Sequence, residues 1–211
     1  MALHRKHTEI RQKQIIDAAK KLIMRYGSEH VTVRRIAGQI GITEAAIYRH
    51  FKSKREILSL LVDDIRQSWT NEVKQASSEN IPFSDRLQSI LLNRISVAEQ
   101  KGGISFLIIA EILSLGDKGL NKQASDVVEA YIHDIAQIIS EGIKQGELKP
   151  ETDPASTALI LYGMVQGVVN VWALSNRDFN LVERYSSCWQ TFQKTNFQKI
   201  QEEFEHEYVT D

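Results

Sequence analysis

The chain has 211 residues, a single cysteine (Cys188) and a formal net charge of −1, and 42% of its residues are hydrophobic and 25% charged. This composition is ordinary for a globular protein with its own core and excludes a disordered chain, while one cysteine excludes an internal disulfide and the usual structural zinc sites. No apolar run approaches the roughly 18 residues of a membrane span, and the charged N-terminus does not resemble a signal peptide. We therefore expect a cytoplasmic protein without a membrane partner.

The spacing of apolar residues predicts an all-α fold of about nine helices. Thr, Ser, Asp, Pro and Gly at the ends of the apolar repeats mark where each helix begins or ends. The predicted helices run from about Thr8 to Tyr26, from a Thr32 cap to Gly41, over a short stretch after a Thr43 cap, from Ser53 to about Ala76, Ser84 to about Glu99, Ile104 to Leu115, about Leu120 to Lys144, Pro154 to about Leu174, and Leu181 to about Glu205.

The near-zero net charge hides two segments of opposite sign. Residues 1–55 hold 13 Lys and Arg against 4 Asp and Glu, whereas residues 56–211 hold 13 against 23. Such asymmetry favours a polyanionic partner for the basic end, although a solvated basic face would also explain the charge alone. We expect two domains, a basic one over residues 1–53 and an acidic one over residues 54–211.

Residues 32–51 have the pattern of a helix-turn-helix. Ala37 is small enough to let two helices approach, Gly41 permits the positive φ of a tight turn, Thr43 can start the second helix, and Ile47 returns to the core. This unit places its second helix in the major groove of DNA.

The outward positions of this unit predict the contacts with DNA. Alanine can touch a thymine methyl group, arginine can pair with guanine, and hydroxyls, basic groups and helix N-termini can bind phosphates. The candidates are Thr32, Arg34, Arg35, Thr43, Glu44, Ala45, Tyr48, Arg49, His50 and Lys54. A basic arm that could follow the backbone or enter a minor groove is formed by His4, Arg5, Lys6, Arg11 and Lys13.

Residues 8–65 resemble the DNA-binding domain of the TetR family of transcriptional regulators. The matching positions are Ile15–Ala19, Tyr26-Gly27, Val31–Val33, Arg35–Ala37, Gly41–Thr43, Ile47–Phe51, Lys54 and Leu58. The resemblance implies a homodimer, an all-helical body, and repression that a small ligand relieves. It assigns DNA binding to residues 1–53, and ligand binding and dimerisation to residues 54–211. Glu44 departs from the family pattern, which often has a small, polar or basic residue there, and its carboxylate can accept from a cytosine amino group but repels phosphate.

The last two long helices are the expected dimer interface. The helix after Pro154 is apolar on most sides and so needs cover all round, and two glycines four residues apart permit close approach of a second helix. The last helix adds aromatic residues of the kind enriched at interfaces. The expected interface residues are Leu159, Gly163, Gly167, Val182, Tyr185, Trp189 and Phe192; the alternative is a central helix of a monomeric bundle.

Polar residues within apolar surroundings are the candidates for an effector pocket. Tyr162, Gln166 and Asn170 form one stripe, which could bind a ligand or meet its copy across the dimer. Phe106, Ile109 and Leu113, together with Tyr131, could line an apolar cavity, or they are plain core. The effector would be a small apolar or amphipathic molecule of unknown identity.

The sequence offers no catalytic, metal or cofactor site. Glu129 and His133 share a helix face but lack the Glu-x-x-His spacing of di-metal bundles, and there is no glycine-rich phosphate loop. Two functions remain, a ligand-responsive DNA-binding repressor and a DNA-binding architectural or protein-regulated factor. A large enclosed apolar cavity in the body favours the first, and a fully packed body favours the second.

Overall fold

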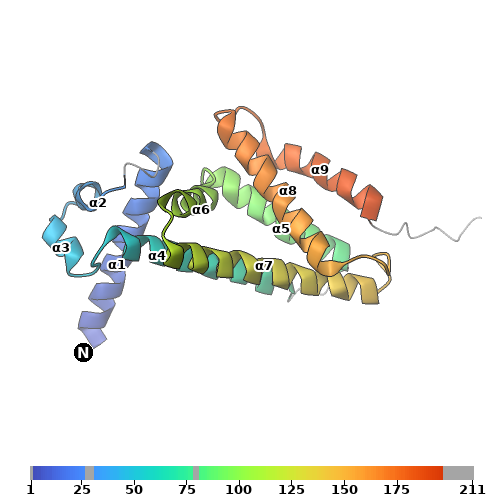
Figure 1. The fold of residues 1–211 in the computed structure, drawn as a ribbon, viewed down its shortest axis with the longest axis horizontal. Coiled ribbons are helices and arrows are strands. Elements are labelled where there is room, and N and C mark those ends of the chain that lie inside the picture. Colours follow the sequence, from blue (N-terminus) through green and yellow to red (C-terminus); the bar gives the residue numbers. More distant parts are fainter. Residues whose placement is uncertain (1, 27–30, 78–80, 197–211) are drawn as a thin grey trace, which may run out of the picture.

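The computed structural model describes residues 2–26, 31–77 and 81–196, and this part of the chain is helical with short connections. Figure 1 shows the arrangement of the helices. They are α1 (Ala2–Tyr26), α2 (Val33–Ile40), α3 (Glu44–Tyr48), α4 (Lys54–Ser77), α5 (Phe83–Gln100), α6 (Ile104–Leu115), α7 (Lys118–Lys144), α8 (Pro154–Leu174) and α9 (Leu181–Asn196). The predicted all-α class is therefore confirmed.

Local capping explains most of the helix boundaries. The Thr32 hydroxyl accepts from the Arg35 N–H and the Thr43 hydroxyl from the Ala46 N–H, each at 3.2 Å. Gly41 ends α2 with φ of 68°, a left-handed conformation that suits glycine. Asp153 caps α8 by accepting from the Ser156 N–H at 2.8 Å, with proline in the first turn. Side chains within a few residues of each helix end thus set these ends, as predicted.

Two helices begin earlier than expected from the sequence. Helix α1 begins at Ala2 instead of Thr8, so the expected basic arm is the first part of a helix; the side chains of His4, Arg5 and Lys6 lie outside the described residues. Helix α7 begins at Lys118, because the Asp117 carboxylate accepts from the Leu120 N–H at 2.9 Å and caps it two residues earlier than predicted. The predicted continuation of α9 to Glu205 falls outside the described residues.

The molecule has a head and a body joined by α4. Helices α1 to α3 lie at one end, α4 runs from there along α7, and α8 and α9 lie at the far side of the body (Figure 1). One apolar core of buried residues extends through both parts. Helix α4 begins at Lys54, the first residue after the expected domain boundary, and contacts helices of both the head and the body.

Candidate functional site

The outer surface of the head is built around α3. Ile47 is fully buried and anchors this short helix, while Ile36 and Ala37 fix α2 beneath it. The side chains on the opposite sides of α2 and α3 from these buried residues face outward. The exposed candidates for DNA contact are Thr32, Arg34, Arg35, Thr43, Glu44, Ala45, Tyr48 and Arg49, and His50 is half-buried beside them.

Two residues on this surface have local structural partners as well. The Arg35 guanidinium lies over the Tyr26 ring at 5.9 Å from its centre. Glu44 occupies the first turn of α3, where the helix dipole favours a negative charge, so its departure from the family pattern has a structural reason. Both residues remain exposed and can be reached by a polyanion.

Lys54, also a predicted DNA contact, has a partner within the protein. Its Nζ donates to Oε1 of Glu111 at 2.9 Å, and the Glu111 side chain is buried. This ion pair holds the first turn of α4 to α6. The Lys54 side chain itself stays 31% exposed, and its contact with DNA stays a prediction.

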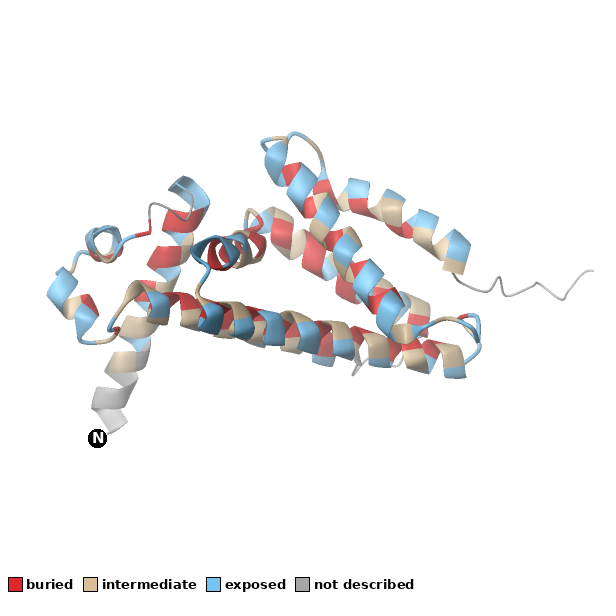
Figure 2. Ribbon diagram, in the orientation of Figure 1, coloured by how far each residue is buried: buried red, intermediate tan, exposed pale blue. Residues whose placement is uncertain are grey.

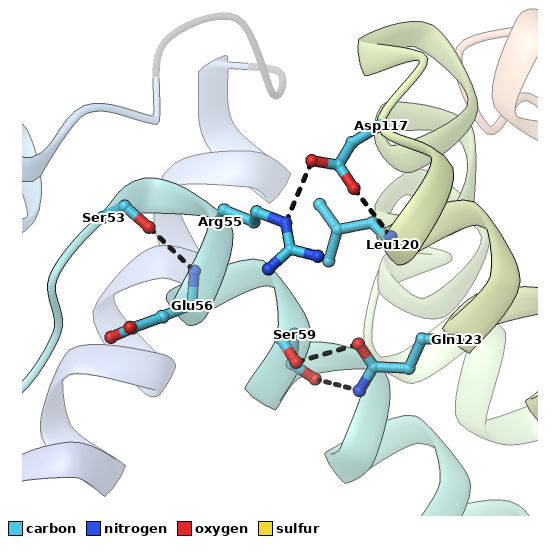
Figure 3. A network of polar contacts seen from close by, with 7 residues as sticks. All are labelled: Ser53, Arg55, Glu56, Ser59, Asp117, Leu120 and Gln123. Atoms are coloured by element: carbon cyan, nitrogen blue, oxygen red, sulfur yellow. Dashed lines mark hydrogen bonds and ion pairs between the residues drawn. The ribbon is translucent and has the colours of Figure 1, made fainter.

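Two further polar contacts hold α4 against α7, and with Lys54–Glu111 they form what we call the α4 joint. Arg55 Nε donates to Oδ2 of Asp117 at 2.9 Å. The Ser59 hydroxyl donates to Oε1 of Gln123 at 2.8 Å, and Gln123 Nε2 donates to the Ser59 carbonyl at 3.1 Å. Figure 3 shows these contacts. The Leu120 N–H and the Arg55 guanidinium lower the pKa of Asp117, so its carboxylate is charged at neutral pH.

Helix α8 presents an apolar surface to solvent in the single chain. Leu159, Ile160, Val171 and Leu174 are all more than half exposed, and a Cβ added at Gly163 or Gly167 would meet nothing within 4 Å. Figure 2 shows exposed positions in pale blue along this helix. By length and composition α8 is the one described helix that could cross a bilayer. Its inner side, however, packs on α7 and α9. An apolar outer side on such a helix is typical of a surface that another protein chain covers.

The aromatic residues expected to face a dimer partner from α9 lie elsewhere. Tyr185 and Trp189 are 0% and 1% exposed and pack inside the protomer, so the expectation that they form a contact face is wrong. Val182 and Phe192 are half-buried on the same helix. The helical spacing that marks an interface stripe is also the spacing of a core stripe, and here the aromatic residues fill the core between α5, α8 and α9.

A buried ion pair lies within the body, where α4, α5 and α7 meet. Arg94 Nη1 donates to Oε2 of Glu72 at 3.3 Å, and their side chains are only 4% and 9% exposed. The Arg94 guanidinium lies 3.5 Å from the centre of the Trp69 ring and 4.0 Å from that of Tyr131. Burial raises the pKa of Glu72 above its ordinary value, and the positive charge of Arg94 lowers it in part.

A cavity of about 20 Å³ adjoins this pair. It is large enough for about one water molecule. Its walls are Ser68, Trp69, Glu72, Arg94, Val97, Ala98, Gly103, Ile104, Ser105 and Phe106. Of the predicted pocket residues, Phe106 lines this cavity, and Tyr131 lies against Arg94, which is also a wall residue.

The other predicted pocket residues are scattered. Leu113 is 67% exposed and Asn170 is also exposed, so neither lines an internal cavity in this conformation, because their faces of α6 and α8 turn outward. Ile109 is half-buried. Tyr162 is partly buried, which raises its pKa, and Gln166 Nε2 donates to Asn170 Oδ1 at a long 3.5 Å.

Sequence reasoning missed Arg94 and Glu72, although the sequence contains a signal for both. Arg94 falls in the buried stripe of Leu87, Ile90, Leu91, Ile95 and Ala98, and Glu72 in that of Ile65, Trp69, Val73 and Ala76. A charged residue at a core position of an amphipathic helix requires a buried partner. The sequence alone did not show that the two charges meet, because they lie on different helices.

Glu129 and His133, which we considered as metal ligands, have protein partners on their own helix. Glu129 accepts from the Ser125 hydroxyl at 2.8 Å, and a hydrogen bond of 3.0 Å joins His133 Nε2 to Gln137 Nε2. Among the described residues no group of three or more His, Cys, Asp or Glu is placed to hold a metal ion.

Two family models match the chain. Residues 15–61 match the model of bacterial regulatory proteins of the tetR family, and residues 54–194 match the model of the C-terminal region of YsiA-like proteins. Together they cover the head, α4 and the body. The first match includes the whole helix-turn-helix unit.

Relatives and solved structures agree with this match. A nucleoid occlusion factor, SlmA of Photobacterium profundum, is 26% identical over 85% of this chain and 92% of its own. A fatty acid metabolism regulator protein of Bacillus subtilis is 25% identical over 80% and 87%. The crystal structure of the transcriptional regulator FadR from Bacillus subtilis with stearoyl-CoA has a TM-score of 0.73 and 22% identity, over 84% of this chain and 95% of that one. The last likeness is one of fold.

Proposed function

This chain belongs to the TetR family of bacterial regulatory proteins, and from that premise we propose that it is a cytoplasmic transcriptional repressor that binds a palindromic operator as a homodimer and leaves it when a small molecule enters the body. The observation that carries this proposal is the outward face of α3, where Ala45, Tyr48 and Arg49 are exposed on a helix held by a buried Ile47. The family assignment makes the chain a DNA-binding regulator; the operator, the repression and the effector are the proposed part.

The exposed face of α8 supports the dimer. Leu159 and Ile160 lie one turn from Gly163, and Gly167 follows after another turn, so a second copy of α8 could approach its backbone closely. With a two-fold axis through this face, the dimer would carry one α3 helix in each of its two heads. Their separation would have to match one helical turn of DNA, roughly 34–36 Å, for both to enter successive major grooves.

The length of α4 supports a link between effector and DNA. The α4 joint holds its first turns, and Glu72 holds its other end through Arg94. From Lys54 to Glu72 the helix spans about 27 Å at 1.5 Å per residue. A molecule that binds better when α4 has shifted would change the spacing of the heads and weaken operator binding.

A second function is favoured by one observation. The cavity beside Arg94 is only about 20 Å³ in this conformation, too small for an effector molecule, as expected for a factor that a protein regulates. The match to a nucleoid occlusion factor is consistent with that alternative. In it the chain would bind the same kind of operator but respond to a macromolecule.

The proposal is tested by selecting DNA from a random pool with the purified full chain. We expect an inverted repeat whose half-site centres lie about one helical turn apart. A selected site without two-fold symmetry, or none at all, would contradict the proposed dimeric repressor.

The two functions are separated by treating the chain–operator complex with a cell extract divided by size. Release by the dialysable fraction supports a small effector. Release only by the retained macromolecular fraction supports the protein-regulated alternative. An operator without any binding site for RNA polymerase nearby would argue against repression itself.

A further inference from the structure

Arg94 is a buried cation with hydrogen-bonding capacity left over, which is a property of residues that anchor ligands. Arg94 is 4% exposed, and its guanidinium lies against the rings of both Trp69 and Tyr131, which also contact each other. Nη1 reaches Glu72, whereas Nη2 is fully enclosed and completes no hydrogen bond of normal geometry with any residue that the structure describes. The cavity lies against this group. A buried donor of this kind is costly unless something accepts from it.

The two members of the pair are held very differently. Glu72 is held by Arg94 at 3.3 Å and by the Ser68 hydroxyl at 3.4 Å, both long hydrogen bonds. Burial raises the pKa of Glu72, which means that its charged form is disfavoured in this place. The Arg94 guanidinium, by contrast, is also held by two aromatic rings, and these contacts do not depend on Glu72. The carboxylate is therefore the exchangeable member.

We infer that Arg94 anchors the effector, that the effector is a small carboxylic acid with an apolar body, and that its carboxylate replaces that of Glu72 on the guanidinium. This inference rests on the proposed release by a small molecule and names the chemical class of that molecule. The replacement forms one ion pair and breaks another, and no bond is made or broken covalently.

The surroundings favour a carboxylate over other head groups. A carboxylate has the charge and the planar shape of the group it displaces, and it can accept from both terminal nitrogens of Arg94. A phosphate dianion would bring more negative charge than one buried guanidinium can neutralise. The other walls, with Trp69, Ile104 and Phe106, suit an apolar body next to the acid.

The size of the cavity couples binding to movement. A space of about 20 Å³ cannot hold such an acid, so the acid binds only when α4 has moved away from α5 and α6. Glu72 is then released toward solvent together with the end of α4 that it holds. Because α4 begins at the head, this opening shifts the population toward the form with lower affinity for the operator.

The inference is tested by isothermal titration calorimetry of the purified full chain with octanoate and benzoate, each against its neutral alcohol, octanol or benzyl alcohol. We expect at least one of the two acids to bind and its alcohol to bind more weakly by about tenfold or more, because charge-assisted hydrogen bonds are the strong class. The same acid should release the selected operator DNA in a fluorescence anisotropy titration.

Variants of the pair give opposite expected results. Glu72→Gln removes the competing charge and should tighten binding of the acid several-fold, which a folding defect cannot imitate. Arg94→Met should lower the affinity for the acid to that for its alcohol. The double variant Glu72→Gln/Arg94→Met should lower it equally, without leaving a buried charge unpaired. Arg86→Met is the matched control and should leave binding unchanged. Arg86 is on α5, as Arg94 is, but it pairs with Glu141 of α7 and does not line the cavity.

The inference is overturned if neither acid binds in preference to its alcohol, if Glu72→Gln does not tighten binding, or if the variants that lack Arg94 bind the acid as the wild type does. These failures leave the proposed function intact when the chain still selects an inverted repeat and the dialysable fraction still releases it. The proposed function fails separately, if no such site is selected.

Discussion

Arg55, in the first turn of α4, donates from Nε to Oδ2 of Asp117, the residue whose other carboxylate oxygen caps α7 (Figure 3). One carboxylate thus starts a body helix and holds the helix that leads to the head. This contact is a point at which a movement in the body would be passed to the DNA-binding surface.

Asp117→Asn should make stability depend less on pH. Asparagine keeps a side-chain oxygen for the cap but loses the charge that Arg55 attracts. The pKa of Asp117 is lowered, so its contribution to stability is present above the ordinary value of 3.8 and is lost as the pH falls through the lowered value. The variant should therefore unfold at a lower temperature than the wild type at neutral pH, and the two should converge in strong acid. A difference in melting temperature that stays constant with pH would contradict this role.

Tyr48→Ala should weaken operator binding without unfolding the chain. Tyr48 is 52% exposed on α3 and carries no part of the core. Losing one contact of this kind costs about 1–3 kcal/mol of binding free energy. Fluorescence anisotropy with the selected operator measures it, and circular dichroism checks the fold. Its neighbour Ile47, fully buried, gives the contrast: Ile47→Ala should lower the free energy of unfolding by about 2–5 kcal/mol. An unchanged affinity of Tyr48→Ala would remove this residue from the interface.

Operator binding should weaken steeply with salt. The head carries the basic excess, and with about six phosphate contacts per dimer the logarithm of the affinity should fall against the logarithm of salt concentration with a slope of about −5 or steeper. Anisotropy titrations across a series of salt concentrations give this slope. Substituting the exposed Arg34 by glutamine should make it shallower, whereas a flat response in the wild type would exclude binding through phosphates.

Gly167→Leu should convert the proposed dimer to a monomer that remains folded. A side chain at Gly167 meets nothing within the protomer, and leucine is the better helix former, so the single chain should not be destabilised. In the proposed dimer, where the α8 helices of the two chains lie close together, the leucine side chain would push them apart. Sedimentation equilibrium measures the mass, and Ala130→Leu, on the exposed side of α7, is the control that should stay dimeric. A dimer in both variants would place the interface elsewhere.

Arg94 and Glu72 should show strong coupling in a double-mutant cycle. Arg94→Met alone leaves a buried carboxylate without its partner, which costs about 3–5 kcal/mol of unfolding free energy. The double variant with Glu72→Gln leaves no buried charge and should recover much of this loss. Urea denaturation of the four proteins gives the coupling energy, and strictly additive losses would mean that the 3.3 Å pair does not act as one unit.

The sequence by itself determined the helices, their caps and the family of the head. Thr32, Thr43 and Asp153 each cap a helix by accepting from an N–H three residues away, and Gly41 ends α2 in a left-handed conformation. These interactions are local, so the order of residues along the chain is enough to predict them. The same holds for the outward face of α3, because the positions of its core residues leave the others exposed.

Only the tertiary structure decided which faces of the body helices are core and which are free. Tyr185 and Trp189 of α9 are buried, whereas the apolar outer side of α8 is exposed, although the two helices have similar apolar spacing. Arg94 and Glu72 are 22 residues apart, and Lys54 and Glu111 are 57 apart. Helical periodicity defines faces on each helix separately, and packing alone determines which faces meet and which buried charges become partners.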